Sequence, residues 1–335
     1  MAAEGHARVP GGVPRARLAP RARAFEYSLS VDPARRGSIA LATCAEFPRL
    51  APDDVPFAAA LERLGLRPVP ARWDDPAEPW AAHAAVILRS CWDYHHRAAA
   101  FARWLDQLER LGARVYNALP TLRWNMRKTY LRDLAAAGIP VTGTVWAEMG
   151  STTTLRDIAQ STGWTVMVVK PTVSASGWET WLVERAGVAE DERRFAEHLR
   201  SRDLMVQPFM PGIVTEGEIS FVFLAGRFSH AVRKRPMPGE FRVQEEHGGS
   251  VERELPAERL VCQAVRALAA APGGPGATAG PGGTVAPLYA RVDGLVVDGA
   301  LVVTELELIE PKLYFGWGEG AAEELAGVVA REVGV

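Results

Sequence analysis

The sequence predicts an α/β protein, mixed with α+β features, in which a small parallel layer precedes a second unit that ends in an acidic hairpin. Two observations lead to this prediction. Strand patterns alternate with helical patterns over residues 37–118, which is typical of a parallel sheet. Near the C-terminus, Asp298 and Gly299 separate two runs rich in Val and Leu, and an Asp-Gly pair in such a place is a strong hairpin signal.

The overall composition limits the class of protein. At 335 residues the chain is long enough for two or three subdomains, and 48% hydrophobic residues suffice for sizeable cores. No apolar run approaches the length of a membrane span, and a net charge of −2 leaves no basic footprint for nucleic acid. The three cysteines (Cys44, Cys91 and Cys262) lack metal or disulfide spacing, which favours a reducing cytosol. We therefore expect a cytoplasmic protein without nucleic-acid or membrane partners, and a homo-oligomer is compatible with the sequence.

Two segments have compositions that do not support packing. Residues 1–36 are rich in Ala, Arg, Pro and Gly without periodicity and are predicted to form a disordered, mildly basic tail. The apolar stretch after Arg35 and Arg36 is short, so a twin-arginine export signal is not expected. Residues 271–284, rich in Gly and Pro, are predicted to be a disordered surface insertion.

The remaining chain is predicted to contain an α/β substrate domain and two further subdomains. Their predicted bounds are 37–118, 119–206 and 207–335. The elements expected in the first are strands near 38–43, 67–69, 85–88 and 114–116 and helices over 55–65 and 97–111. Ligands of parallel sheets bind outside the carboxyl ends of the strands, so residues 89–95 are expected at the mouth of a site.

Arg89 is a candidate for substrate contact at this mouth. The alternative is that Arg89 pairs with Asp93 while Trp92 and Tyr94 are packing residues. The residue types alone do not decide between these two interpretations.

A lysine at the end of a buried strand marks the second subdomain. Lys170 ends this strand and leads into a loop of small residues, 172–180. The lysine ammonium is a compact charge for phosphate oxygens, and the backbone N–H groups and serine hydroxyls of the loop can fold over them. The order of a Walker A loop is absent, so a surface hairpin is the competing interpretation. A second lysine, Lys128, lies near the start of a helix expected over 126–137.

The third subdomain begins with a strand, near 205–210, that is expected to run between two lobes. Gln207 could donate and accept hydrogen bonds along one purine edge, while Phe209 supplies an apolar slot. A hairpin over 218–232 follows, and residues 233–235 (Arg-Lys-Arg) would place cations near its mouth.

Three acids lie on the hairpin at 290–311: Asp293, Glu305 and Glu307. Side chains alternate faces along a strand, so Glu305 and Glu307 share a face. Two such glutamates disfavour burial unless a cation lies between them, and hard oxygen ligands suit Mg²⁺ shared with a phosphate-bearing substrate. A solvated face of an edge hairpin is the alternative. A regular two-residue turn would set Asp293 opposite Thr304, so we expect a bulge or a longer turn that brings Asp293 and Glu305 together.

In this order, the inter-lobe strand, the strand-ending lysine with its loop, and the acidic hairpin resemble the ATP-grasp superfamily. The resemblance covers residues 119–334 and is strongest at Arg291 and Asp293 on one strand and Glu305 and Glu307 on the other. It implies an ATP-grasp fold with an N-terminal, Rossmann-like pre-ATP-grasp domain. It also implies ATP and two Mg²⁺ ions as cofactors, with Mn²⁺ able to substitute.

Carried over position by position, the resemblance implies a role for each candidate residue. The nucleotide would be held by Lys128, Lys170, Ser174, Ser176, Gly177, Gln207, Phe209, Glu218 and Lys234. The metal ions would be held by Asp293, Glu305 and Glu307, where many relatives have Asn at the last position. Arg291 and Lys170 would be the catalytic residues: Arg291 would steady the transferring phosphoryl group, while Lys170, with Lys128, would hold the α- and β-phosphates.

More narrowly, the chain looks like a glutathione-synthetase-like branch that includes the ligase closing the D-cycloserine ring. The motifs that carry this likeness are residues 89–94, 229–234 and 305–311. The implied substrate contacts are Arg89, Tyr94, His230 and Glu310. Relatives often have Ser where this chain has Lys312.

The chemistry implied is carboxylate–amine ligation. ATP would convert an acid into an acylphosphate with release of ADP, and an amine would then attack to give a small amide, either peptide-like or cyclised. Water would destroy the acylphosphate, so loop 172–180 is the candidate lid. The alternatives are a non-catalytic ATP-binding sensor or scaffold and a phosphotransferase acting on a small molecule. The acids and Arg291 argue against the sensor, since binding adenine needs none of them.

Overall fold

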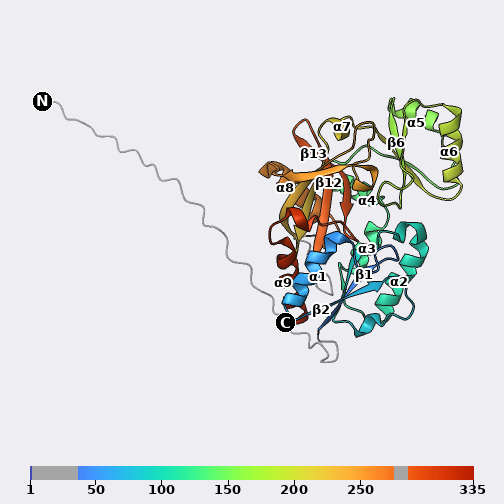
Figure 1. Cartoon of the computed structure of the whole chain (residues 1–335). Helices are drawn as coiled ribbons and strands as arrows, with labels where there is room; N and C mark the ends of the chain where they lie inside the picture. Colours follow the sequence, from blue (N-terminus) through green and yellow to red (C-terminus); the bar gives the residue numbers. More distant parts are fainter. Residues whose placement is uncertain (2–36, 275–285) are drawn as a thin grey trace. The chain divides into compact units, whose positions relative to one another are not determined.

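The computed structural model describes residues 37–274 and 286–335, together with Met1 (Figure 1). Apart from Met1, the predicted N-terminal tail lies outside the described residues, and so does most of the predicted insertion. The first residues of the insertion are described and packed. Ala271 belongs to a core cluster with Leu268, and the Pro272 carbonyl accepts a hydrogen bond from Thr121 Oγ1 at 2.9 Å. The prediction that the insertion begins at residue 271 is therefore wrong.

The first sheet is parallel, as the alternating strand and helix patterns predict. Its strands, in spatial order, are β2 (Arg67–Arg72), β1 (Ser38–Thr43), β3 (Ala85–Ser90) and β4 (Val115–Tyr116). All residues of β1 and β3 are buried because helices cover both faces. Helices α1 (Val55–Arg63) and α9 (Ala321–Val333) pack side by side on one face, and α2 (Ala98–Arg110) packs on the other (Figure 1).

A second sheet is antiparallel and carries Lys170. Its strands, in spatial order, are β5 (Val145–Ala147), β8 (Leu204–Pro208), β6 (Met167–Pro171) and β7 (Trp181–Val183). Helices α5 (Leu155–Thr162) and α6 (Ala189–Leu199) pack on it (Figure 1). Helix α5 begins with a capping box between Thr154 and Asp157 and ends at Gly163, whose φ is 76°. The domain boundaries stay predictions, although β8 crosses the one expected after residue 206.

The third sheet is also antiparallel and carries the acids. Its strands, in spatial order, are β11 (Ser250–Glu254), β10 (Arg227–Arg235), β9 (Glu218–Leu224), β12 (Tyr289–Val297) and β13 (Ala300–Glu307). Helices α4 (Tyr130–Ala136) and α8 (Glu258–Ala269) pack on one face, and α9 packs on the other. Helix α9 therefore lies between this sheet and the parallel one. No helix in the described ranges is long and apolar enough to cross a bilayer.

Lys128 lies in a turn rather than in a helix. The helix predicted over 126–137 forms only over α4, and Lys128 stands between α3 (Leu119–Asn125) and α4. Its backbone N–H donates to the Thr172 carbonyl at 2.7 Å instead of continuing a helical pattern. This bond ties the turn to the start of loop 172–180. A short helix, α7 (Gly212–Thr215), follows β8.

A buried polar network fastens the segment after β13 to the parallel sheet. Arg89 at the end of β3 is 1% exposed, and its Nε lies 2.8 Å from Asp54 Oδ1. The same guanidinium donates to the Pro311 carbonyl at 2.7 Å. Asp53 accepts hydrogen bonds from the backbone N–H groups of residues 313–315 at 2.9 to 3.1 Å. The chain after the acidic strand is thus held by Arg89 and Asp53 of the N-terminal layer.

We expect Arg89→Ala to lower the free energy of unfolding by about 3–5 kcal/mol, because it leaves the Asp54 carboxylate buried without its partner. Urea unfolding followed by circular dichroism measures the change. Arg97→Ala is the matched control: Arg97 pairs with Asp74 and Asp93, but its side chain is 43% exposed, so the loss should stay below about 1 kcal/mol. Equal losses in the two variants would contradict a structural role specific to Arg89.

Candidate functional site

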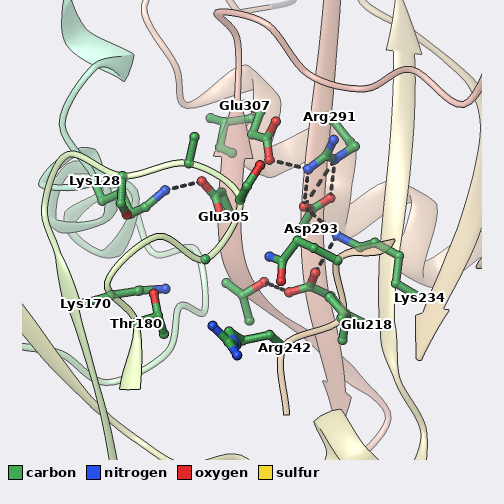
Figure 2. Close-up of a pocket in the computed structure, with 18 of the residues that line it drawn as sticks. Lys128, Lys170, Thr180, Glu218, Lys234, Arg242, Arg291, Asp293, Glu305 and Glu307 are labelled. Carbon is green, nitrogen blue, oxygen red and sulfur yellow. Dashed lines mark hydrogen bonds and ion pairs between the residues drawn. The ribbon is translucent and has the colours of Figure 1, made fainter. Parts of the chain in front are cut away.

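One pocket is lined by residues of the two antiparallel sheets and by segments that follow strands of all three sheets. Figure 2 shows the acids of β12 and β13 facing Lys128 and Lys170, which come from the other side of the pocket. Trp92 and Tyr94, which follow β3, also line it, as do residues of the 310–314 segment. The predicted acids and cations therefore converge on one pocket.

The acidic hairpin contains the predicted bulge. Its tip is a two-residue turn, with left-handed φ values of 50° at Asp298 and 77° at Gly299, and pairing is regular as far as Gly294 opposite Val303. The register then shifts by one residue, so that Asp293 stands opposite Glu305. The residue skipped by this shift is Thr304, which lines the pocket together with its neighbour Glu305.

A glycine makes the bulge possible. A Cβ atom at position 294 would lie 2.6 Å from a methyl group of Leu301 and 2.7 Å from the Val302 carbonyl oxygen. Any larger residue would therefore push the two strands apart next to Asp293. The glycine that follows Asp293 in the sequence is a signal for a bulge, although this glycine alone does not fix the position of the bulge.

Each of the three acids is paired with a cation of the chain (Figure 2). Asp293 contacts Arg291 at 2.9 Å and Lys234 Nζ at 3.0 Å. Glu307 also pairs with Arg291, and Glu305 pairs with Lys128. Among the described residues, no three His, Cys, Asp or Glu side chains form a ready-made metal cluster.

The pKa values show how unevenly these charges are balanced. Burial alone would raise the pKa of Asp293, but Arg291 and Lys234 outweigh it and hold the pKa well below its ordinary value. Burial raises the pKa of Glu307 to about 7, with Arg291 opposing the rise and Glu305 and Asp293 adding to it. Burial would raise the pKa of Glu305 as well, but Lys128 and then Lys170 reverse the shift.

The donor set fits a divalent cation. Carboxylate oxygens on one face of a sheet are the hard ligands that Mg²⁺ prefers. The raised pKa of Glu307 indicates that more positive charge would be favourable beside it. The pairs with Lys128 and Arg291 would have to loosen for a metal ion to reach Glu305 and Glu307.

Lys170 is a half-buried cation that faces the acids without a partner among the described residues. In the parts of the chain that the structure describes, its ammonium has neither an ion pair nor a hydrogen bond, and it lines the pocket. Burial and the charge of Lys128 lower its pKa. Two positive charges close together in a buried site favour a polyanion between them. This arrangement supports the phosphate role expected for both lysines.

Loop 172–180 lines the pocket with the small residues predicted for it. Ser174 is buried, and its hydroxyl donates to the Pro171 carbonyl at 3.2 Å. Ser176 and Gly177 both adopt left-handed φ angles of 49° and 66°, which turn the chain at the pocket. The Ser176 carbonyl lies 3.2 Å from His247 Nε2.

The residues expected to bind adenine and ribose lie on the same pocket. Gln207 is buried and donates to Thr144 Oγ1 at 2.9 Å, and Phe209 lies edge-on to Phe241. Glu218 pairs with Lys234 at 2.6 Å and accepts a hydrogen bond from a threonine of β13, Thr304, at 2.6 Å. Gln207, Phe209 and Glu218 all line the pocket, and their roles remain proposals.

Two of the four predicted substrate residues lie outside the pocket lining. Arg89 is held in the core by Asp54, so both the substrate contact and the alternative pair with Asp93 are wrong. His230 is 7% exposed, and its Nε2 lies 3.0 Å from the Leu313 carbonyl oxygen. Both residues support the segment after β13 instead. Tyr94 and Glu310 do line the pocket.

Other pocket residues are not indicated as functional by the sequence. Arg242 lines the pocket from an irregular segment between β10 and β11, and it pairs with Glu240 at 2.7 Å. Lys312 pairs with Glu245 at the same pocket. Neither follows a strand end or a periodic pattern, so only the tertiary structure brings them to the site.

The middle of loop 172–180 is anchored by Trp178. Its ring centroid lies 5.2 Å from that of His95 and 5.0 Å from that of His96, both of which follow β3. The guanidinium of Arg202 stacks over the same ring at 4.9 Å. The loop is therefore clamped between the N-terminal layer and the end of α6.

Comparisons with known proteins agree with this geometry. Residues 39–117 match the family model of the N-terminal domain of D-cycloserine synthetase DcsG. The cycloserine biosynthesis protein DcsG of Streptomyces lavendulae is 29% identical over 306 residues, which cover 89% of this chain and 99% of that protein. The crystal structure of D-cycloserine synthetase DcsG has a TM-score of 0.77 at 27% identity and covers 89% of this chain and 100% of that one.

More distant structures share the fold. D-alanine–D-alanine ligase from Bacillus anthracis has a TM-score of 0.62 at 14% identity, with 89% of this chain and 97% of that chain covered. The ATP-grasp ligase PsnB complexed with minimal precursor has a TM-score of 0.58 at 18% identity, with 88% and 99% covered. These likenesses confirm the ATP-grasp fold. The chain is an ADP-forming ATP-grasp ligase similar to the D-cycloserine synthetases.

Proposed function

We propose that this ligase joins a small carboxylic acid to a small amine through an acylphosphate, giving a peptide-like or cyclised specialised metabolite. The observation that carries the proposal is the convergence of Lys128, Lys170 and Arg291 with three acids in one pocket. Binding adenine alone requires none of these charges, whereas phosphoryl transfer to a carboxylate requires both signs. No observation in the described residues favours the sensor or phosphotransferase alternatives. We further propose a cytoplasmic enzyme with two Mg²⁺ ions and without nucleic-acid or membrane partners.

The nucleotide would lie along the wall formed by β6, β8 and loop 172–180. Lys170 and Lys128 would hold phosphate oxygens, since Lys170 is unpaired in the described structure and Lys128 can exchange Glu305 for phosphate. Gln207 and Phe209 would hold the adenine, and Glu218 the ribose hydroxyls. Bound Mg²⁺ would neutralise charge on the phosphates beside Asp293, Glu305 and Glu307.

Arg291 would stabilise the phosphoryl group as it passes to the acid. Its guanidinium is fixed by Asp293 and by the Lys312 carbonyl, which accepts from Nη1 at 3.1 Å. A preorganised cation of this kind needs no rearrangement when negative charge develops. Loop 172–180 would exclude water from the acylphosphate, and Trp178 would hold the loop closed.

We expect Glu305→Ala to reduce ADP release by about a hundredfold or more, because it removes a ligand of the metal and the partner of Lys128. The assay supplies ATP, Mg²⁺ and a panel of amino acids, and it measures ADP. Glu246→Gln is the control, since Glu246 is an exposed acid on the rim of the same pocket. Wild-type-like ADP release from Glu305→Ala, with an unchanged melting temperature, would refute this assignment of the metal site.

We expect Trp178→Ala to uncouple the reaction. Without the aromatic anchor, water reaches the acylphosphate, so the ratio of ADP to amide should rise several-fold above that of the wild type. Quantifying both products by mass spectrometry in one sample measures this ratio. Trp317→Ala, which removes a tryptophan that is 40% exposed and outside this pocket, should leave the ratio unchanged. An unchanged ratio in Trp178→Ala would show that the loop is not held by this contact.

The contact between His95 and Trp178 of loop 172–180 should weaken at low pH. Burial and the neighbouring His96 lower the pKa of His95 to about 4, below its ordinary value of 6.5. The unfolded chain therefore binds the extra proton first, and the stability contributed by neutral His95 is complete above pH 6.5 and lost as the pH falls towards 4. The urea midpoint of the wild type should thus fall more steeply over this range than that of His95→Gln. Parallel pH profiles would contradict the prediction.

A further inference from the structure

Two consecutive residues of β13, Thr304 and Glu305, both line the pocket. Consecutive side chains of a regular strand point to opposite faces, so this arrangement results from the bulge. The register shift there leaves Thr304 as the residue without a counterpart on β12. The bulge thus supplies the pocket with a second side chain besides the acid.

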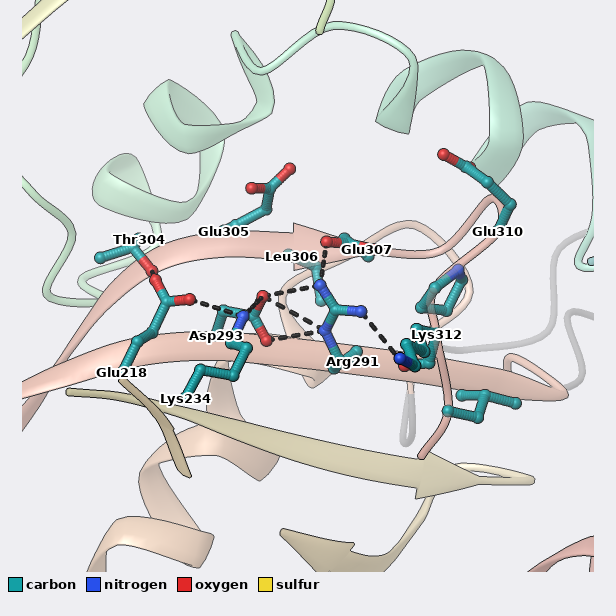
Figure 3. A network of polar contacts seen from close by, with 12 residues as sticks. Glu218, Lys234, Arg291, Asp293, Thr304, Glu305, Leu306, Glu307, Glu310 and Lys312 are labelled. Atoms are coloured by element: carbon teal, nitrogen blue, oxygen red, sulfur yellow. Dashed lines mark hydrogen bonds and ion pairs between the residues drawn. The ribbon is translucent and has the colours of Figure 1, made fainter. Parts of the chain in front are cut away.

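The hydroxyl group of Thr304 is bonded to Glu218, the first residue of β9. Its Oγ1 lies 2.6 Å from Glu218 Oε1. In the sheet, β12 lies between β9 and β13, so this hydrogen bond spans a whole strand and ties β9 to the bulge. Figure 3 shows Thr304 and Glu218 at one end of the polar network, with Lys234 and Asp293 next to them.

Both oxygens of the Glu218 carboxylate are held by a donor. A carboxylate only accepts hydrogen bonds, so Thr304 is the donor to Oε1. The other oxygen, Oε2, lies 2.6 Å from Lys234 Nζ, which also contacts Asp293 at 3.0 Å. Glu218 is 8% exposed and Lys234 is 4% exposed, so bulk water competes little for these bonds. The plane of the carboxylate is therefore fixed at two points.

This arrangement leaves Glu218 with acceptor sites for a ligand. Each carboxylate oxygen can accept about two hydrogen bonds. Thr304 and Lys234 are its two polar contacts in residues 37–274 and 286–335, and they use one site on each oxygen. One site then remains on each oxygen, which matches the pair of adjacent hydroxyl groups of a ribose. The bond from Thr304 helps to set the direction of these sites.

We propose that Thr304 is a positioning residue for sugar selection: it orients Glu218 so that the carboxylate accepts from both ribose hydroxyls and disfavours deoxynucleotides. The inference rests on the proposed function, in which Glu218 binds the ribose, and deepens it by assigning sugar discrimination to the bulge. Thr304 acts through Glu218 and not by contact with the nucleotide. The bulge then serves two parts of one ligand, with Glu305 at the metal and Thr304 behind the sugar contact.

Nucleotide binding tests this role without relying on turnover. Full-length enzyme in Mg²⁺ is titrated calorimetrically with ADP, 2′-deoxyADP and 3′-deoxyADP. The wild type should bind ADP about tenfold or more tightly than either deoxynucleotide, since each hydroxyl donates to a charged acceptor. Thr304→Val keeps the branched shape and removes the hydroxyl, and it should reduce this preference to about threefold or less. Thr304→Ser retains a hydroxyl and should preserve the wild-type preference.

A second background separates action through Glu218 from direct contact with the sugar. In Glu218→Gln the preference for ADP should already be low, and the addition of Thr304→Val should not lower it further. Thr162→Val is the matched control. Thr162 donates to the Ile158 carbonyl at 2.7 Å in α5, outside the pocket lining, so its loss should leave the preference unchanged.

Three results would overturn the proposal: an unchanged preference in Thr304→Val, a preference that is lost in Thr304→Ser as well, or a further loss when Thr304→Val is added to Glu218→Gln. A wild type that binds ADP without any preference would refute the ribose role of Glu218 and this inference with it. Absence of ADP release with every acid tested, while the sugar preference follows Thr304, would count against the proposed ligation alone.

Discussion

The site depends on one extra residue in β13. Side chains alternate along a strand, so a regular hairpin from the turn at Asp298 and Gly299 would place Asp293 and Glu305 on opposite faces. The shift at Thr304 sets them opposite each other and returns Leu306 to the core with Val292. The pairing of β12 with β13 therefore has one register near the turn and another, shifted by one residue, at the acids. Packing of the apolar face fixes both, because a slip at either end would bury the acids and expose the leucines.

The second constraint is charge. The pocket buries several acids and bases, and the chain folds with them because most are already paired: Lys128 with Glu305, and Arg291 with Asp293 and Glu307. Removing one partner of such a pair costs more than the pair contributes. The cations assigned to phosphate are thus held by the acids assigned to metal. A polyanion that bound alone would break these ion pairs and leave the acids without cations. A metal ion that bound alone would break them and leave the cations without acids. Under the proposed function, a metal–nucleotide complex would satisfy both sets at once, so we expect the two to bind as a unit.

Local patterns were sufficient to predict much of the fold. The strand at Ser38–Thr43 has the predicted bounds, and the helix at Val55–Arg63 begins at the predicted residue, because each has a clear apolar pattern. The pocket positions of Lys170 and the acids also follow from the sequence, since strand ends and alternating faces place them. The position of Arg89 could not be predicted this way. Its place at a strand end is correct, but the sequence does not show that Asp54 reaches it first. Arg242 comes from an irregular segment with no periodic signal.

The two wrongly predicted substrate residues explain how the segment after β13 is kept in position. Arg89 holds the Pro311 carbonyl, and His230 approaches the Leu313 carbonyl from the opposite sheet. Asp53 binds the N–H groups that follow, so the segment after β13 is fixed from both sides. Glu310 is in this segment, and its carboxyl group lines the pocket without an ion pair among the described residues. Residues outside the pocket lining thus determine the position of a segment that lines it.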